Sequence, residues 1–175
     1  MTLGMWAEVA NRWVGPAVRV AATARSHRPQ RIAADGSSTP ATVPDSIAAA
    51  AELARGATAS YHLSTCAAFG GGHSIEIYGS RGALQYRFFV EEILGATAGE
   101  EKLRPIPIPP EEERGQTTDA EFVQAIRSGS PVSPTFEEGL RYMEFCEAVA
   151  LSAKTGAAVA VPSEGPPVDS WASAV

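Results

Sequence analysis

The chain has 175 residues, of which 45% are hydrophobic, and its 14 basic and 20 acidic side chains give a formal net charge of −6. A chain of this length buries on the order of 70% of its unfolded surface, so an ordinary hydrophobic core suffices without disulfides or metal. The acidic balance and the lack of a basic stripe disfavour nucleic acid as a partner. We expect one domain over residues 1–162.

Cysteine use and hydropathy predict a cytoplasmic location. Cys66 and Cys146 form no C-x-x-C pair and lie on different expected elements, so reduced thiols are the simplest interpretation. No apolar run approaches the ~20 residues of a membrane span. A secretion signal begins with a positively charged segment followed by an apolar one, and this pattern is not found after Met1. We therefore expect a protein that is neither secreted nor bound to a membrane.

The first third of the chain is predicted to contain one helix and several strands. Residues 5–14 have helical spacing, with one apolar side formed by Trp6, Val9, Ala10 and Trp13. Residues 18–25 alternate as a half-buried strand does. Residues 29–45 are rich in Pro, Gly, Ser and Thr and are interpreted as a long loop or partly disordered insertion.

The next two strands are expected to form a hairpin. Residues 46–54 and 57–67 are joined by a tight turn at Arg55 and Gly56. On the second strand, one side carries Ala59, Tyr61 and Leu63, and the other carries Thr58, Ser60, His62 and Ser64. One face of the sheet is therefore predicted to be apolar and the other mostly hydroxylic.

Further pairing is predicted downstream. Residues 75–78 alternate in polarity until the run GSRG, residues 79–82, reverses the chain, and residues 83–90 form the returning strand. Residues 102–108 include prolines at alternate positions, which cannot all donate ladder hydrogen bonds. That segment is expected at a sheet edge.

The last quarter, from Phe122 to Pro162, has the pattern of helix, prolyl loop, long helix and short strand. Thr118 with Glu121, and Thr135 with Glu138, fit the capping box. Left-handed caps are expected at Gly129 and Gly156. The long helix has an apolar face formed by Tyr142, Met143, Cys146, Val149 and Ala150.

These elements predict an α+β fold, an open and mostly antiparallel sheet of about six strands with helices packed on one face. Three helical segments are expected to cover the apolar face. Residues 163–175 show neither helical nor strand periodicity of hydrophobic residues and are predicted to form a flexible tail.

Four segments together resemble a known family: IEIYGSRGAL, F-x-x-A-I-R-S-G, PTFEEGLRYM and EAVALSAKTGAAVAVP. Their order is similar to that in the C-terminal domain of the glucose-fructose oxidoreductase / inositol dehydrogenase (Gfo/Idh/MocA) family. The similarity runs from about Gly4 to Pro162. It implies the same fold and the substrate-binding and oligomerisation half of an NAD(P)-dependent sugar or cyclitol oxidoreductase.

The resemblance also implies a cofactor, NAD or NADP, for a full-length family member. Family members bind it on an N-terminal Rossmann domain that opens with a strand and G-x-G-x-x-G, a run that this sequence lacks. Gly70, Gly71 and Gly72 are consecutive and precede a strand. The family's Glu-Lys-Pro motif is missing too, since Leu103 follows the only Glu-Lys pair. We expect this chain to bind no cofactor and to be inactive in isolation.

The resemblance places any chemistry on the first helix, where many members carry G-x-H-x-x-D and the histidine takes a hydroxyl proton. Aligning Gly4 with the family's glycine and Trp13 with its following tryptophan puts Trp6 and Val9 at the histidine and aspartate positions. Neither exchanges a proton, so both are expected only to face a substrate. Glu8 is the candidate catalytic acid if the alignment slips by one residue, and a solvated helix carboxylate is the alternative.

No metal site is predicted. His27, His62 and His73 lack a second His, Cys or acid at metal-ligand spacing in the sequence and are interpreted as surface or interface histidines.

A homodimer through the open sheet face is expected, because the residues of the hydroxylic strand face are small and uncharged and family members commonly associate there. Two functions stay open: the oxidoreductase half with a sugar-like substrate, and a stand-alone binding or assembly module.

Overall fold

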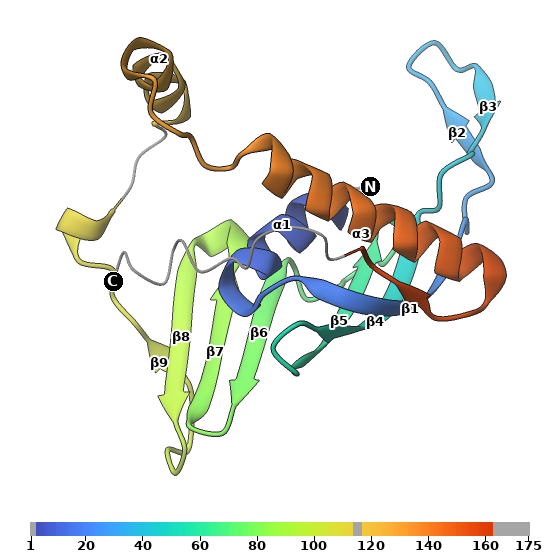
Figure 1. The fold of residues 1–175 in the computed structure, drawn as a ribbon. Helices are drawn as coiled ribbons and strands as arrows, with labels where there is room; N and C mark the ends of the chain where they lie inside the picture. Colours follow the sequence, from blue (N-terminus) through green and yellow to red (C-terminus); the bar gives the residue numbers. More distant parts are fainter. Residues whose placement is uncertain (1–2, 114–116, 163–175) are drawn as a thin grey trace. The chain divides into compact units, whose positions relative to one another are not determined.

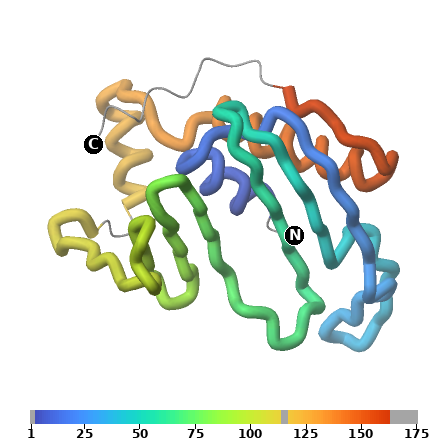
Figure 2. The backbone as a smooth tube through the Cα atoms, turned by 90° about the horizontal axis from the view of Figure 1, so that it is seen from below, coloured from blue at the N-terminus to red at the C-terminus, as the bar shows by residue number. Residues whose placement is uncertain are grey.

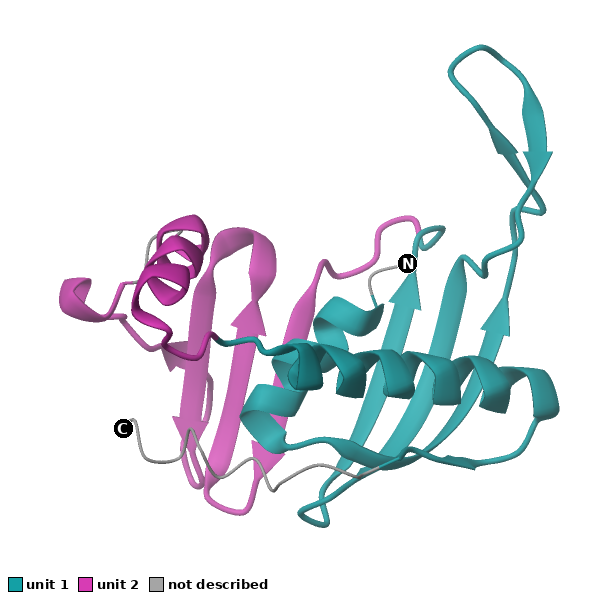
Figure 3. Ribbon diagram, turned by 45° about the horizontal axis from the view of Figure 1, so that its top comes forward, with its two compact units in different colours: residues 1–67, 133–175 teal, residues 68–132 magenta. Residues whose placement is uncertain are grey.

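The computed structural model describes residues 3–113 and 117–162, so the tail expected at 163–175 lies outside the described residues (Figure 1). Its backbone divides into two compact units (Figure 3). Unit 1 comprises residues 1–67 and 133–175, and unit 2 comprises residues 68–132. The predicted α+β class is confirmed. Its strands are divided between a four-stranded sheet in each unit and a two-stranded hairpin, where one sheet of about six was expected.

The sheet of unit 1 is antiparallel, with the strand order β10-β1-β4-β5. Its strands are β1 (Ala17–Arg25), β4 (Ser46–Leu53), β5 (Thr58–Ser64) and β10 (Val159–Ala160). Figure 2 shows the backbone of the three long strands side by side. The turn after β4 contains Gly56 at φ +84, a conformation that favours glycine, which confirms the predicted hairpin.

Two helices pack with this sheet into one core. They are α1 (Leu3–Val14) and α3 (Phe136–Thr155), and Figure 1 shows α3 lying across the strands of unit 1. Val20 of β1 and Val149 of α3 are each 1% exposed, and Phe145 lies against Tyr61 with ring centroids 5.1 Å apart. The alternation predicted for β5 is therefore correct, because Tyr61 faces the helix.

The buried face of α3 agrees only in part with the one expected. Val149 is buried and Tyr142 and Cys146 pack against the core, but Met143 and Ala150 are exposed. The buried residues of the helix are Phe145, Ala148, Val149 and Ser152, whereas Met143 is 58% exposed. Met143 precedes Phe145 by two residues, or about 200° around an α-helix, so the two side chains point in nearly opposite directions. The expectation that Met143 faces the sheet is wrong. Trp13 of α1 is likewise 43% exposed, and the buried residues of that helix are Leu3, Trp6 and Ala7.

The helix ends follow local hydrogen bonding. The capping box at Thr135 is confirmed, since the Glu138 amide donates to the Thr135 hydroxyl (3.2 Å) and the Glu138 carboxylate accepts from the Thr135 amide (2.6 Å). The box expected at Thr118 is wrong. The N-cap of α2 (Thr118–Ser128) is Thr117, whose hydroxyl donates to the Glu121 carboxylate at 2.7 Å. The left-handed caps at Gly129 (φ 68) and Gly156 (φ 72) are confirmed.

A hairpin occupies the segment that was expected to be a loop. Its strands are β2 (Gln30–Ile32) and β3 (Ser38–Pro40). The turn is stabilised by the Asp35 carboxylate, which accepts from the Ser37 amide at 2.9 Å, and by Gly36 at φ +82. An Asp-Gly pair is a strong hairpin signal. The composition of the segment obscured it.

Unit 2 contains a second antiparallel sheet, with the strand order β6-β7-β8-β9. Its strands are β6 (Ser74–Gly79), β7 (Gly82–Arg87), β8 (Glu92–Thr97) and β9 (Arg104–Pro105), and a 3-10 turn, η1, spans Phe88–Val90. The hairpin at residues 79–82 and the proline-marked edge strand are confirmed. Strand β8 was not predicted from the sequence. Helix α2 has no buried side chain, so the expected covering of a sheet by three helices holds only for α1 and α3.

Candidate functional site

The first helix brings only two of the predicted site residues to one side. Trp6 is 9% exposed and Val9 is half-buried, and their spacing of three residues puts them on neighbouring positions of one helix face. Glu8 is two residues from Trp6 and therefore lies on the other side. Its carboxylate pairs with the Arg12 guanidinium one turn later. The Glu8 side chain is 20% exposed, so this carboxylate is half-buried and paired, and its catalytic role stays a prediction.

A second candidate is the face of the unit 1 sheet that points away from α3. We call it the open face, and its exposed residues are Arg19, Ala21, Thr23, Arg25, Ala48, Ala50, Glu52, Thr58, Ser60 and His62. The register aligns Ala21 with Ala50 and Ala50 with Ser60, so the middle of the face is flat and uncharged. One ion pair, Arg19 to Glu52 at 3.1 Å, borders it.

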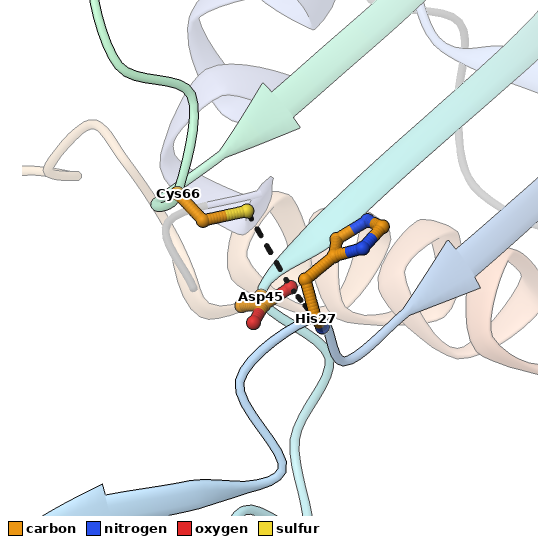
Figure 4. Close-up of side chains that lie close together, drawn as sticks. All are labelled: His27, Asp45 and Cys66. Atoms are coloured by element: carbon orange, nitrogen blue, oxygen red, sulfur yellow. Dashed lines mark hydrogen bonds between the residues drawn. The ribbon is translucent and has the colours of Figure 1, made fainter.

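A third candidate is a cluster of three chemically different side chains at one end of the same sheet. The register aligns Arg25 with Ser46 and Ser46 with Ser64. His27, Asp45 and Cys66 lie just beyond these three strand ends. One donor atom of each lies within 4.8 Å of the other two, and Figure 4 shows the carboxylate near the thiol.

Asp45 is the fixed member of this cluster. Only 4% of its surface is exposed, and its carboxylate accepts from the His27 amide at 3.0 Å and the Arg28 amide at 2.8 Å. The Asp45 carbonyl accepts from the Thr65 amide at 2.9 Å. The hydrogen bond from the His27 amide lowers the pKa of the Asp45 carboxyl below its ordinary value, so the group is ionised at neutral pH.

Sequence spacing could not identify this cluster, because 18 residues separate His27 from Asp45 and 21 separate Asp45 from Cys66. The only local signal was the position of each residue next to a strand end. His62 lies on the open face and His73 begins the approach to β6, so the structure does not bring the three histidines together.

Unit 2 contains a cavity of about 500 Å³ beside β8. Its walls are Arg87, Val90, Glu91, Glu92, Ile93, Ile106, Pro107, Ile108 and Glu113. The Arg87 guanidinium lies 3.3 Å from the Glu92 carboxylate, so these two charges of the wall are paired with each other. None of the site residues predicted from the sequence lines this cavity.

Solved structures of oxidoreductases share this fold. Levoglucosan dehydrogenase in complex with NADH has a TM-score of 0.79 at 22% identity, and the alignment covers 91% of this chain and 48% of that one. Its complex with NADH and L-sorbose has a TM-score of 0.75 at 24% identity, covering 89% and 47%. An NAD binding oxidoreductase from Klebsiella pneumoniae has a TM-score of 0.76 at 19% identity, covering 90% and 48%. The chain thus spans about half the length of these proteins.

The family model described as GFO/IDH/MocA C-terminal domain matches residues 6–85. This match over residues 6–85 confirms the resemblance to that family seen in the sequence, and the solved structures show the same fold. No curated protein matches the sequence significantly. None of the helices in the described part of the chain combines the length and apolar character of a membrane span.

Proposed function

We propose that this chain is the substrate-binding and dimerisation half of an NAD(P)-dependent sugar or cyclitol oxidoreductase. One observation supports this most directly. About nine tenths of the chain superposes on about half of dehydrogenases whose structures contain NADH, one of them with L-sorbose. A sugar-like substrate is the corresponding small-molecule partner.

In this proposal the isolated chain binds no dinucleotide tightly and catalyses no hydride transfer. The sequence has no G-x-G-x-x-G between a strand and a helix to hold the pyrophosphate. Trp6 and Val9 cannot transfer protons, and Glu8 is paired with Arg12. Calorimetric titration with NADH and NADPH should show no binding at micromolar concentrations. Micromolar affinity for either would contradict the assignment of the cofactor to another part of the full-length protein.

Dimerisation is assigned to the open face. Its central residues are small and uncharged, whereas a face built only for solvent usually carries Lys and Glu. Flat faces of small residues allow two sheets to approach to about 10 Å. A two-fold axis then lets one patch serve both subunits.

The dimer is tested by introducing like charges into the centre of the open face. Ser60→Arg with His62→Arg places arginines across the two-fold axis, so light scattering should report folded monomers where the unmodified chain is a dimer. Leu151→Arg is the matched control, because Leu151 is 47% exposed on α3, on the helical side of the sheet. A monomeric unmodified chain, or a dimer that survives both arginines, would refute this assignment.

A stand-alone binding module with the same fold is the second candidate, and the lack of a proton-transferring residue at Trp6 and Val9 favours it. The genomic sequence directly upstream of the first codon separates the two candidates. An in-frame Rossmann domain there would favour the oxidoreductase.

A further inference from the structure

We propose that His27, Asp45 and Cys66 form a binding site for Zn²⁺, with one coordination position left for water or an exogenous ligand. The three side chains supply one nitrogen, one oxygen and one sulfur donor, and these atoms lie within 4.8 Å of one another (Figure 4). The site belongs entirely to unit 1.

The three donor atoms favour Zn²⁺ and other transition metals over Mg²⁺ and Ca²⁺. Imidazole and thiolate are ligands for Zn²⁺ and related transition metals, whereas Mg²⁺ and Ca²⁺ prefer oxygen alone. One thiolate and one carboxylate together neutralise the charge of a divalent ion. Binding would release the proton of the Cys66 thiol to solvent, because the thiolate is the ligand.

The geometry requires only a small adjustment. In a tetrahedral zinc site the bond lengths of about 2.0 to 2.3 Å place neighbouring donor atoms about 3.6 Å apart. The Cys66 sulfur already lies 3.8 Å from the nearer Asp45 oxygen. His27 is exposed, so its ring can rotate toward the other two donors without disturbing the core.

Asp45 has a structural role that explains its burial, since it binds the amides of His27 and Arg28 where the chain leaves β1. The Asp45 Oδ1 atom accepts from the His27 amide and the Cys66 thiol, and Oδ2 accepts from the Arg28 amide. Oδ2 therefore retains a lone pair, and Oδ1 regains one when the thiol loses its proton on binding a metal. A structural role does not require a thiol and an imidazole beside the same carboxylate. Their convergence from three strand ends is the observation that points to a ligand.

A neighbouring hydroxyl lies within hydrogen-bonding distance of the proposed sulfur ligand. The Ser64 oxygen lies 3.3 Å from the Cys66 sulfur and accepts from the Cys66 amide at 3.3 Å. Such a hydroxyl can donate to a metal-bound sulfur and hold its orientation, as outer-shell partners of metal ligands do. Three protein ligands with one open position are typical of zinc sites that exchange a ligand, whereas four protein ligands are typical of structural sites.

The test is titration of the untagged, chelator-treated chain with Co²⁺, followed by displacement with Zn²⁺. One equivalent of Co²⁺ should give the visible bands of four-coordinate cobalt and a thiolate-to-cobalt charge-transfer band in the near ultraviolet. Cys66→Ser should abolish the charge-transfer band, and His27→Gln should weaken Zn²⁺ binding by about ten-fold or more. Neither change touches the two amide bonds of Asp45, so both variants should fold.

Cys146→Ser and His62→Gln are the matched controls, because they remove the other cysteine and a histidine of the open face. Both should bind Co²⁺ with unchanged spectrum and affinity. The proposal is overturned if the unmodified chain gives no charge-transfer band, or if Zn²⁺ binding survives both Cys66→Ser and His27→Gln. Binding that is lost in His62→Gln but retained in His27→Gln would place the metal elsewhere and would equally refute it.

Discussion

The hydroxyl of Ser152 links α3 to the sheet, and we expect Ser152→Ala to destabilise the chain measurably. Ser152 is 1% exposed on the sheet-facing side of the helix. Its oxygen accepts from the Ala22 amide of β1 at 2.9 Å and donates to the Ala157 carbonyl at 2.7 Å. The short β10 pairs with Arg19 and Val20 only, so Ala22 lies beyond that pairing and its amide uses the hydroxyl instead.

The size of the effect follows from the two groups that would lose a partner. A buried donor left without an acceptor costs about 1–3 kcal/mol. The Ala22 amide meets that condition, because the substitution leaves no oxygen in its place. Ala157 is exposed, so water can replace the hydroxyl at its carbonyl at little cost. Removing one oxygen leaves almost no cavity. We therefore expect a loss of about 2 kcal/mol in the free energy of unfolding.

Urea denaturation followed by circular dichroism measures this loss. Thr155→Ala is the control, since Thr155 lies in the same last turn and its hydroxyl donates to the Leu151 carbonyl at 2.9 Å on the exposed side of the helix. That variant should change the unfolding free energy by no more than about 0.5 kcal/mol. Equal midpoints for Ser152→Ala and the unmodified chain would show that the buried amide finds another partner, and the reasoning would fail.

Two further predictions concern the same core. Phe145→Ala should cost about 3–5 kcal/mol in urea denaturation, whereas Met143→Ala should stay within about 0.5 kcal/mol; a larger loss for Met143 would reverse the assigned helix face. Burial raises the pKa of Tyr61, so the unfolded chain ionises this phenol first as the pH rises above about 10, and stability should fall there. Tyr61→Phe should reduce that alkaline loss, and an identical pH profile for the two proteins would contradict it.

Most helices and strands could be predicted from the sequence, because the interactions that begin or end them involve residues only a few positions apart. Thr135 and Glu138 satisfy each other across one helical turn, and Gly156 ends that helix in a conformation that suits glycine. The turn at Gly56 is equally local. The Asp35–Gly36 pair is a local signal too, but it lies in a segment whose Pro, Gly and Ser content is equally typical of a loop.

The centre of the buried face of α3 could not be predicted in the same way. Met143 and Phe145 are both large and apolar, and a helix with apolar residues on several sides has no single preferred face. The sheet decides the choice, because Tyr61 supplies an aromatic partner for Phe145. The role of Ser152 is also invisible in the sequence, since the amide that needs its hydroxyl lies 130 residues earlier in the chain.

The two proposals for unit 1 use different parts of one sheet, so their tests can be separated. The dimer depends on the middle of the open face, around Ser60, whereas the proposed zinc ligands lie beyond the row that ends at Ser64. Ser60 lies four strand residues, or about 13 Å, from Ser64, and His62 lies two residues, or about 7 Å, from it. The ligands lie farther still, beyond Ser64. Substitutions at that distance are usually additive. Arginines on the open face should therefore abolish the dimer and leave Co²⁺ binding intact. If they abolish both, the metal site requires the second subunit, and the three ligands of a single chain are not sufficient.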